Sequence, residues 1–242
     1  MHTLYTNFLV KPIYNLLVSL FNVIPVAEAG LAIILVTIIV RLALFPLSKK
    51  AVKAQVEMQN IAPELEEIKT KYKGNQEEQA RRTLALYRER KVNPFSGILV
   101  LLIQLPVIFA LYHIFISTGF PQIDTTLLYH FIGAPESVNT FFLGSDLTQK
   151  SAVFAILAAI TTYFQIKLAT SSSLTKKNIQ NSGFGGDLAK SMQTQMKYFF
   201  PILVFFISYK ISGVVALYWF TTNLFTIGQE IVVRRKLKEG VV

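Results

Sequence analysis

Long runs of uncharged, apolar residues constrain this chain more than any other feature of its sequence. Residues 29–40, 151–166 and 198–209 contain no charged side chain, and hydrophobic residues make up 52% of the whole chain of 242 residues. A helix needs about 20 predominantly apolar residues to cross the hydrocarbon core of a bilayer. The core of a soluble protein of this size rarely requires such runs. The sequence therefore predicts an all-α integral membrane protein.

Five segments are predicted as transmembrane helices. The first, residues 29–47, is apolar apart from Thr37 and Arg41 and closes with Pro46 ahead of a Ser-Lys-Lys run. The second begins at the Asn93-Pro94 pair, because proline is favoured at the first position of a helix. The region 94–233 holds this helix and three more, at residues 94–116, 151–168, 198–209 and 214–233, with their connecting loops.

The segments between these spans have the composition of loops. Residues 117–150 and 169–197 are polar and contain Gly, and the glycines of residues 183–186 indicate a flexible loop because they follow no predicted strand. Residues 210–213 predict a tight turn between the last two spans.

The N-terminal region, residues 1–28, is more mixed than the spans. Between Leu4 and Ile24, apolar residues alternate with Asn, Lys and Ser, and Pro12 is expected to break the run. An amphipathic helix that lies in the membrane interface accounts for this pattern. A sixth span is the alternative.

Residues 48–93 differ from the rest of the chain, because they hold 11 basic and seven acidic residues. Apolar residues recur within them at near-helical spacing, and Gly74-Asn75 is a turn signal. We therefore predict a helical hairpin that projects from the membrane. Residues 234–242 form a short basic tail.

The distribution of Lys and Arg predicts the orientation. The hairpin, residues 167–197 and the tail together carry 20 of the 24 basic residues. Because cytoplasmic loops of membrane proteins are enriched in Lys and Arg, the hairpin and the C-terminus are expected in the cytoplasm. The N-terminus is expected outside, which an odd number of spans satisfies.

Arg41 is the costliest residue within the predicted spans. It is the 13th residue of the first span, and an arginine at the centre of a transmembrane helix costs about 2.5–3.5 kcal/mol on insertion scales. Either its side chain extends to the cytoplasmic interface, or it faces a wet cavity inside the bundle, which we favour. The only acidic residue within the spans is Glu230, near the cytoplasmic end of the last. An acidic substrate segment is therefore a candidate counter-ion.

Polar residues at helical spacing form stripes on several spans. They are Thr37, Arg41 and Ser48 on the first span, Gln104 on the second, Thr161 and Gln165 on the third, and Trp219, Asn223, Thr226 and Glu230 on the last, with Tyr218 and Thr222 beside them. Residues four apart share one face of a helix. Such side chains either line a common hydrophilic cavity or bond helices to one another. Their combination with Arg41 favours the cavity.

The sequence gives no support for catalysis. It has no cysteine, its three histidines are scattered, and it contains no metalloprotease or phosphate-loop motif. We therefore expect no enzymatic activity, no catalytic residue, no metal and no cofactor. The net charge of +10 does not indicate direct nucleic-acid readout, because the basic residues flank apolar runs.

Four motifs occur together in this chain. They are Thr37-Ile-Ile-Val-Arg41-Leu-Ala-Leu-Phe-Pro46, Asn93-Pro94-Phe95 followed by Leu102-Ile-Gln104-Leu-Pro106, the subsequent Ala110-Leu-Tyr112, and Leu217-Tyr218-Trp219 to Asn223. In combination, and with a charged hairpin of the expected size after the first span, they resemble the YidC/Oxa/Alb family of membrane protein insertases. The resemblance covers nearly the whole chain.

The resemblance implies a five-helix core around a hydrophilic groove that is open to the cytoplasm and to lipid and closed on the outer side. It implies nascent membrane proteins as substrates in a bacterial plasma membrane, with the lipid bilayer, the Sec translocon, the ribosome and a targeting receptor as candidate partners. We expect a short form of the family, without a large outer domain. The family's groove arginine corresponds to Arg41, and the predicted substrate groove comprises Thr37, Arg41, Gln104, Gln165, Tyr218, Trp219 and Asn223.

Two other functions fit the same features. A small-anion channel or transporter would use Arg41 as its binding charge, although no internal repeat is visible. An assembly factor that only holds helices would share the sequence features of an insertase.

Overall fold

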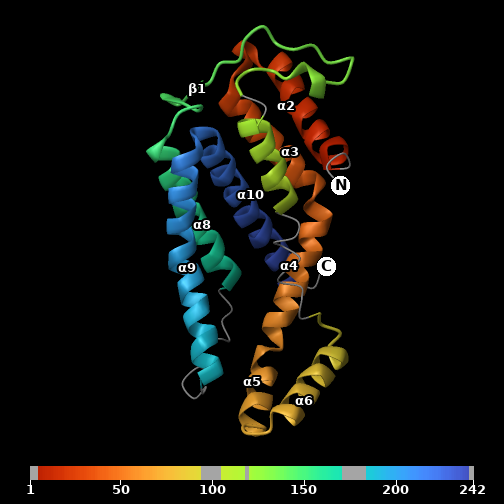
Figure 1. Cartoon of the computed structure of the whole chain (residues 1–242). Helices are drawn as coiled ribbons and strands as arrows, with labels where there is room; N and C mark the ends of the chain where they lie inside the picture. Colours follow the sequence, from red (N-terminus) through yellow and green to blue (C-terminus); the bar gives the residue numbers. More distant parts are fainter. Residues whose placement is uncertain (1–4, 94–104, 118–119, 171–183, 240–242) are drawn as a thin grey trace.

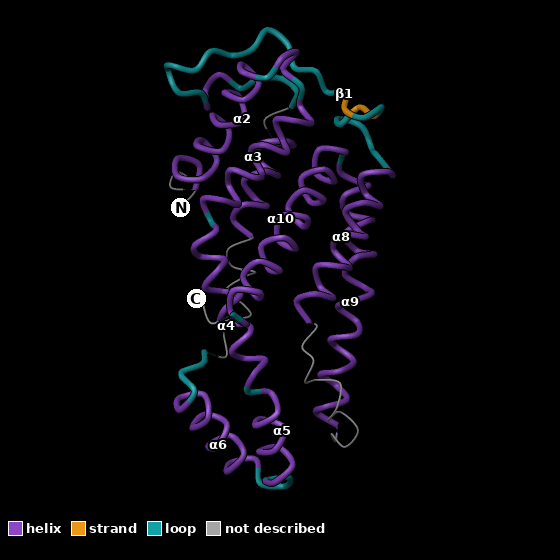
Figure 2. Tube along the Cα trace, turned by 180° about the vertical axis from the view of Figure 1, so that it is seen from behind, coloured by secondary structure: helices purple, strands orange, loops and turns teal. Residues whose placement is uncertain are grey.

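The computed structural model describes residues 5–93, 105–117, 120–170 and 184–239, and the fold is predominantly helical (Figure 1). The long helices run side by side, with α5 and α6 at one end and the loop that carries β1 at the other, as Figure 2 shows from behind. Within the described ranges, the only strands are β1, Phe141–Phe142, and β2, Ser145–Asp146, and they form an antiparallel pair. The predicted all-helical class is therefore confirmed.

Residues 6–23 form a continuous helical segment that packs against α3. A π-helical turn, Thr6–Val10, leads directly into α2, Lys11–Val23. The predicted break at Pro12 is wrong, because this proline stands in the first turn of α2, where a missing N–H is tolerated. The apolar face of α2, which includes Tyr14 and Leu17, is buried. Placement of this helix in a membrane interface stays a prediction.

The helices α3 and α4 form one bent segment. After a 3₁₀ turn, α3 spans Ala29–Ala43 and α4 spans Phe45–Asn60. The bend between α3 and the helical stretch Phe45–Lys71, which α4 begins, is 64°. The first helix therefore ends four residues before the predicted boundary. The cause is Pro46, which has no N–H to donate to the carbonyl of Leu42 and whose ring crowds that carbonyl.

The helices α5, Ala62–Lys71, and α6, Gln76–Glu89, lie side by side beyond α4 (Figures 1 and 2). The chain turns between them at Gly74, whose φ of +98° lies in the left-handed region that glycine adopts readily. An ion pair of 2.9 Å between Arg90 and Glu64 joins the far ends. The placement of these helices in the cytoplasm stays a prediction.

Only the second half of the predicted second span is described. It forms an apolar helix, Leu105–Ile116, whose residues Val107, Ala110 and Leu111 belong to the hydrophobic core shared with α2, α3 and α10. Residues 94–104 lie outside the described residues.

Residues 120–150 form a loop that covers one end of the helices and bonds to two of them. On α2, the phenol oxygen of Tyr14 accepts a hydrogen bond of 2.7 Å from the N–H of Asp124. On α10, the loop passes close to Gly213, where a Cβ would lie 3.1 Å from the Cα of Leu147. The loop therefore holds both helices in place at this end.

The last three helices form a layer in which α8 packs against both α9 and α10. They span Ala152–Thr170, Phe184–Ile211 and Gly213–Lys238. One predicted boundary is wrong: residues 184–197, including two of the glycines assigned to a flexible loop, belong to α9. Residues 234–238 of the predicted basic tail are helical and continue α10. Charged and amide side chains such as Lys, Arg and Gln are good helix formers, so a helix continues beyond the apolar residues that mark a span.

Among the described residues, one segment, Ala152–Ala169 of α8, is long and apolar enough on its own to cross a membrane. The bent pair of α3 and the helical stretch Phe45–Lys71 qualifies when it is taken as one segment. The topology of five spans therefore stays a prediction.

Candidate functional site

Arg41 lies in the last turn of α3, just before the bend, and is only 9% exposed. Because α3 ends at Ala43, Arg41 stands near the end of its helix. Its depth in a membrane span stays a prediction. A cation in the last turn interacts favourably with the terminal carbonyl groups, typically by about 0.3–1 kcal/mol. This interaction offsets part of the cost of burial.

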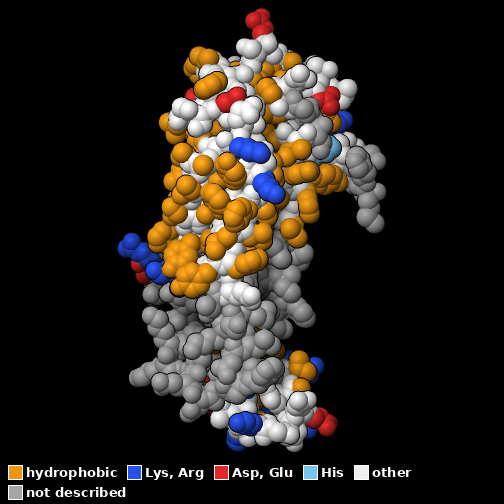
Figure 3. Space-filling view, turned by 60° about the vertical axis from the view of Figure 1, so that its left-hand side comes forward, with side chains coloured by type: hydrophobic (Ala, Val, Ile, Leu, Met, Phe, Trp, Pro, Cys, Tyr) orange, Lys and Arg blue, Asp and Glu red, His pale blue; other side chains and the backbone are white. Residues whose placement is uncertain are grey.

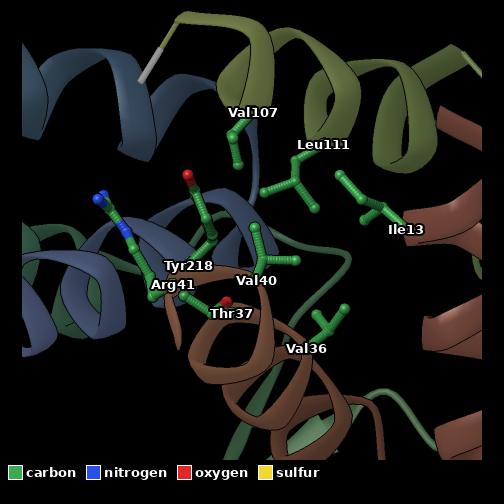
Figure 4. Close-up of a pocket in the computed structure, with 8 residues that line it drawn as sticks. All are labelled: Ile13, Val36, Thr37, Val40, Arg41, Val107, Leu111 and Tyr218. Carbon is green, nitrogen blue, oxygen red and sulfur yellow. The ribbon is translucent and has the colours of Figure 1, made fainter. Parts of the chain in front are cut away.

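Arg41 lines a narrow pocket, with a cavity volume of only about 10 Å³, to which four helices contribute (Figure 4). Its walls are Val36, Thr37, Val40 and Arg41 from α3, Tyr218 from α10, Val107 and Leu111 from the helix Leu105–Ile116, and Ile13 from α2. In Figure 4 the side chains of Arg41 and Tyr218 lie together at one end of the pocket, and Ile13 and Val36 lie toward the other. The pocket thus has a polar end and an apolar wall, so it is less hydrophilic than the predicted cavity.

Three predicted groove residues meet in this pocket: Thr37, Arg41 and Tyr218. The hydroxyl of Thr37 donates a 2.6 Å hydrogen bond to the carbonyl of Ile33 in its own helix. Its oxygen keeps lone pairs that can accept a further bond. The pocket therefore offers a guanidinium donor, a phenol and a hydroxyl acceptor within one wall.

Two residues that the sequence had not assigned to the groove, Thr222 and Gln229, continue the face of α10 that begins at Tyr218. Residues four and eleven apart on a helix lie nearly above one another. Thr222 and Gln229 are 3% and 6% exposed, and neither the hydroxyl oxygen of Thr222 nor the side-chain nitrogen of Gln229 has a hydrogen-bond partner in the described part of the chain. A buried polar group left unpaired costs about 1–3 kcal/mol. Extending the α10 stripe from Tyr218, instead of from Trp219, would have found Gln229.

The other predicted groove residues lie elsewhere. The amide nitrogen of Asn223 donates to the hydroxyl of Thr162 on α8 at 2.7 Å, so this side chain bonds two helices together. Gln165 and Trp219 are half-buried and do not line the Arg41 pocket. Gln104 lies outside the described residues. For Asn223 the structure favours the alternative role of polar residues as bonds between helices.

Glu230 is bound by Arg234, one helical turn further along α10. A nitrogen of Arg234 lies 2.8 Å from a carboxylate oxygen of Glu230, whose side chain is only 4% exposed. Arg234 also donates to the side-chain oxygen of Gln59 on α4, at 3.2 Å, and to the carbonyl of Ala169 on α8, at 3.3 Å. This network joins three helices. Its sequence signal is the i, i+4 spacing of Glu and Arg.

The arrangement suits binding of a polypeptide segment. A buried cation lies beside an apolar wall, and this combination suits contact with a segment of mixed polarity. Across the ranges that the structure describes, no group of three or more His, Cys, Asp or Glu side chains gathers where it could hold a metal ion.

Comparison with known proteins gives a consistent result. A sequence profile of the family described as 60Kd inner membrane protein matches residues 20–240. Proteins named membrane protein insertase YidC are similar over most of the chain. One from Fusobacterium nucleatum is 33% identical, over 87% of this chain and 88% of its own length. One from Clostridium perfringens is 34% identical, over 89% and 87%, and one from Oceanobacillus iheyensis is 31% identical, over 86% and 75%.

Proposed function

We propose that this chain, which belongs to the family of the 60Kd inner membrane protein, is a bacterial membrane protein insertase. The observation that carries the proposal is the similarity to insertases of diverse bacteria over most of the chain. A small-anion channel has no such support, because the relatives described above are all insertases.

In the proposed mechanism, a short hydrophilic segment of a nascent membrane protein enters the bundle at the Arg41 pocket. The guanidinium of Arg41 attracts acidic residues of that segment. The unpaired polar groups of Thr222 and Gln229 then bond to its backbone, which offers both donors and acceptors. The cost of leaving these buried groups unpaired is thus recovered when a substrate is bound.

The step needs no nucleotide. The apolar span of the substrate passes into lipid, and burial of its surface contributes about 25 cal/mol per Å². The membrane potential contributes about 2.3 kcal/mol per charge per 100 mV to the outward movement of acidic residues. Both free-energy contributions, apolar burial and the membrane potential, act on the substrate. The protein therefore has only to lower the barrier to insertion.

The proposed topology has five spans, an outer N-terminus and a cytoplasmic C-terminus. It places α5 and α6 in the cytoplasm, where they would receive the substrate. The asymmetry of Lys and Arg along the chain supports this orientation. The Sec translocon, the ribosome and a targeting receptor are candidate partners of this protein, and the ribosome and the receptor would approach it from the cytoplasmic side.

The test is insertion of a nascent single-span protein with an acidic N-terminal tail into vesicles that contain the purified protein, read out as protease protection of the tail. The variant Arg41→Ala is expected to lower protection at least about tenfold, which corresponds to roughly 1.4 kcal/mol. A client with a neutral tail should be affected much less. Arg235→Ala, which removes an exposed arginine of α10, is the matched control. Equal loss for both clients would argue against attraction of acidic residues by Arg41.

The path of the substrate is tested by photo-crosslinking to a stalled client. A crosslinker at Thr222 should capture the hydrophilic segment, whereas one at Leu224, which is 48% exposed on another face of α10, should not. Protection without capture at Thr222 would keep the insertase function and overturn this path. Capture without protection would indicate a chaperone that holds helices and translocates nothing.

A further inference from the structure

The helices α8 and α9 enclose an apolar groove on the outside of the bundle, away from the Arg41 pocket. Its walls include Ile160, Tyr163 and Phe164 of α8 and Pro201, Phe205 and Phe206 of α9. Figure 3 shows the side of the molecule on which α8 and α9 lie, and hydrophobic side chains cover much of that face. The groove therefore opens toward the surroundings of the protein and not toward its interior.

Pro201 gives the groove part of its shape. It lies inside α9, and a proline within a helix has no N–H for the carbonyl four residues earlier, which here belongs to Lys197. The proline ring also crowds that carbonyl and weakens the helix locally. A backbone carbonyl without its intrahelical donor thus lies at one end of the groove.

A cation lies at the same end. The ammonium nitrogen of Lys197 is 5.6 Å from the ring centre of Tyr163 and 5.4 Å from that of Tyr198. Cation–π contacts at this range hold the ammonium over the two rings. Among the described residues Lys197 forms no ion pair with an acidic side chain. Its charge remains available to an anion, with the two phenol groups beside it.

We propose that this groove is a binding site for an anionic glycerophospholipid. The phosphate group binds Lys197 and the neighbouring tyrosine hydroxyls, and one acyl chain lies along the groove toward Phe206. Charge complementarity selects this occupant, because a basic pocket between helices at the cytoplasmic membrane surface suits an anionic head group. In the proposed topology, Lys197 lies at that surface.

The dimensions agree with this occupant. From Lys197 to Phe206 the chain advances nine residues of α9, which is about 13 Å at a rise of 1.5 Å per residue. The groove is polar only at the Lys197 end and apolar along the rest, as a single acyl chain below its head group requires. The site goes beyond the insertase function and does not use Arg41.

The test uses the intact chain in vesicles and the fluorescence of one tryptophan. The sequence contains a single Trp, so the double substitution Trp219→Phe and Phe206→Trp places the only indole in the groove while keeping an aromatic ring there. Two vesicle preparations have the same composition, phosphatidylcholine with a fixed minor fraction of phosphatidylglycerol. In one the phosphatidylcholine, and in the other the phosphatidylglycerol, carries bromine atoms near the middle of its acyl chains. Bromine quenches the fluorescence of a tryptophan that it contacts. The ratio of the two quenching constants measures the preference for the anionic lipid.

We expect a preference of roughly fivefold for phosphatidylglycerol, as one lysine at a membrane surface provides. Lys197→Gln should bring the ratio close to one, and Lys197→Arg should retain it, which separates loss of charge from misfolding. Lys236→Gln, an exposed lysine of α10, removes the same charge elsewhere and should leave the ratio unchanged. A ratio near one in the parent protein, or an equal drop for Lys197→Gln and Lys236→Gln, would overturn the proposal.

Discussion

Removal of Arg234 should destabilise this protein far more than removal of its neighbour Arg235. Glu230 is 4% exposed at its side chain and Arg234 is 18% exposed, and the two lie 2.8 Å apart. The substitution Arg234→Met would leave a buried carboxylate without its partner. Loss of one partner of a buried ion pair typically costs about 3–5 kcal/mol. The partial exposure of Arg234 places the expected loss near 3 kcal/mol.

A double-mutant cycle separates the ion pair from the rest of the network. Glu230→Gln should cost less, about 1–2 kcal/mol, because Arg234 keeps its bonds to Gln59 and Ala169. In the double variant no buried charge is stranded, so the loss should fall short of the sum of the two single losses by about 1.5–2 kcal/mol. Arg235→Met is the matched control, because its side chain is 81% exposed and its pair with Glu239 should contribute less than about 0.5 kcal/mol.

The measurement is the free energy of unfolding of the purified protein in lipid micelles, obtained by reversible denaturation with SDS. Additive losses in the double variant would mean that the two residues do not interact. A loss for Arg234→Met no larger than that for Arg235→Met would mean that Glu230 is hydrated or neutral. Either result would refute the argument from burial.

Three further predictions follow from single contacts. Asn223→Leu should lower the free energy of unfolding in the same assay by about 0.6–1.7 kcal/mol, because the bond to α8 is lost; no change would show that the amide is not a bond between helices. Gly30→Ala should lower the yield of folded protein in detergent, because the added methyl group would overlap the ring and the Cβ of Phe142, and Phe142→Gly, which removes both, should restore it; failure of this rescue would place the strain elsewhere. Burial acts to raise the pKa of the Asp146 carboxyl, but hydrogen bonds from Thr148 and Thr140 outweigh it and lower the pKa. The stabilisation by Asp146 should therefore be complete above its unfolded pKa of about 4 and fade as the pH falls through the lower folded pKa. Asp146→Asn should remove that pH dependence from thermal unfolding, and an unchanged profile would contradict the assignment.

The sequence by itself determined the helical class, the apolar segments and the family resemblance. Hydropathy is a local property, so a run such as residues 151–166 identifies a helix of the right length without any knowledge of its neighbours. The helix α8 accordingly begins within one residue of the predicted start. The free-energy cost of burying an arginine within an apolar segment also follows from the local sequence, and for this reason Arg41 was identified without the structure.

The tertiary structure decided where helices end and which polar groups meet. Pro46 ends α3 at Ala43, and Arg41 therefore stands in the last turn of this helix. Apolar composition does not show this boundary, because the residues on both sides of the bend are apolar. In the same way, composition gave no sign that α9 and α10 extend into charged sequence.

Adjacent residues of one helix can have different roles, and only the neighbouring helices decide them. Thr222 lies on the face of Tyr218, and its hydroxyl has no hydrogen-bond partner among the described residues, whereas Asn223 bonds to α8. Successive residues are rotated by about 100° around a helix of 3.6 residues per turn. Helix geometry therefore determines the angle between two side chains. Packing against neighbouring helices determines which side chain faces a pocket, a partner helix or lipid.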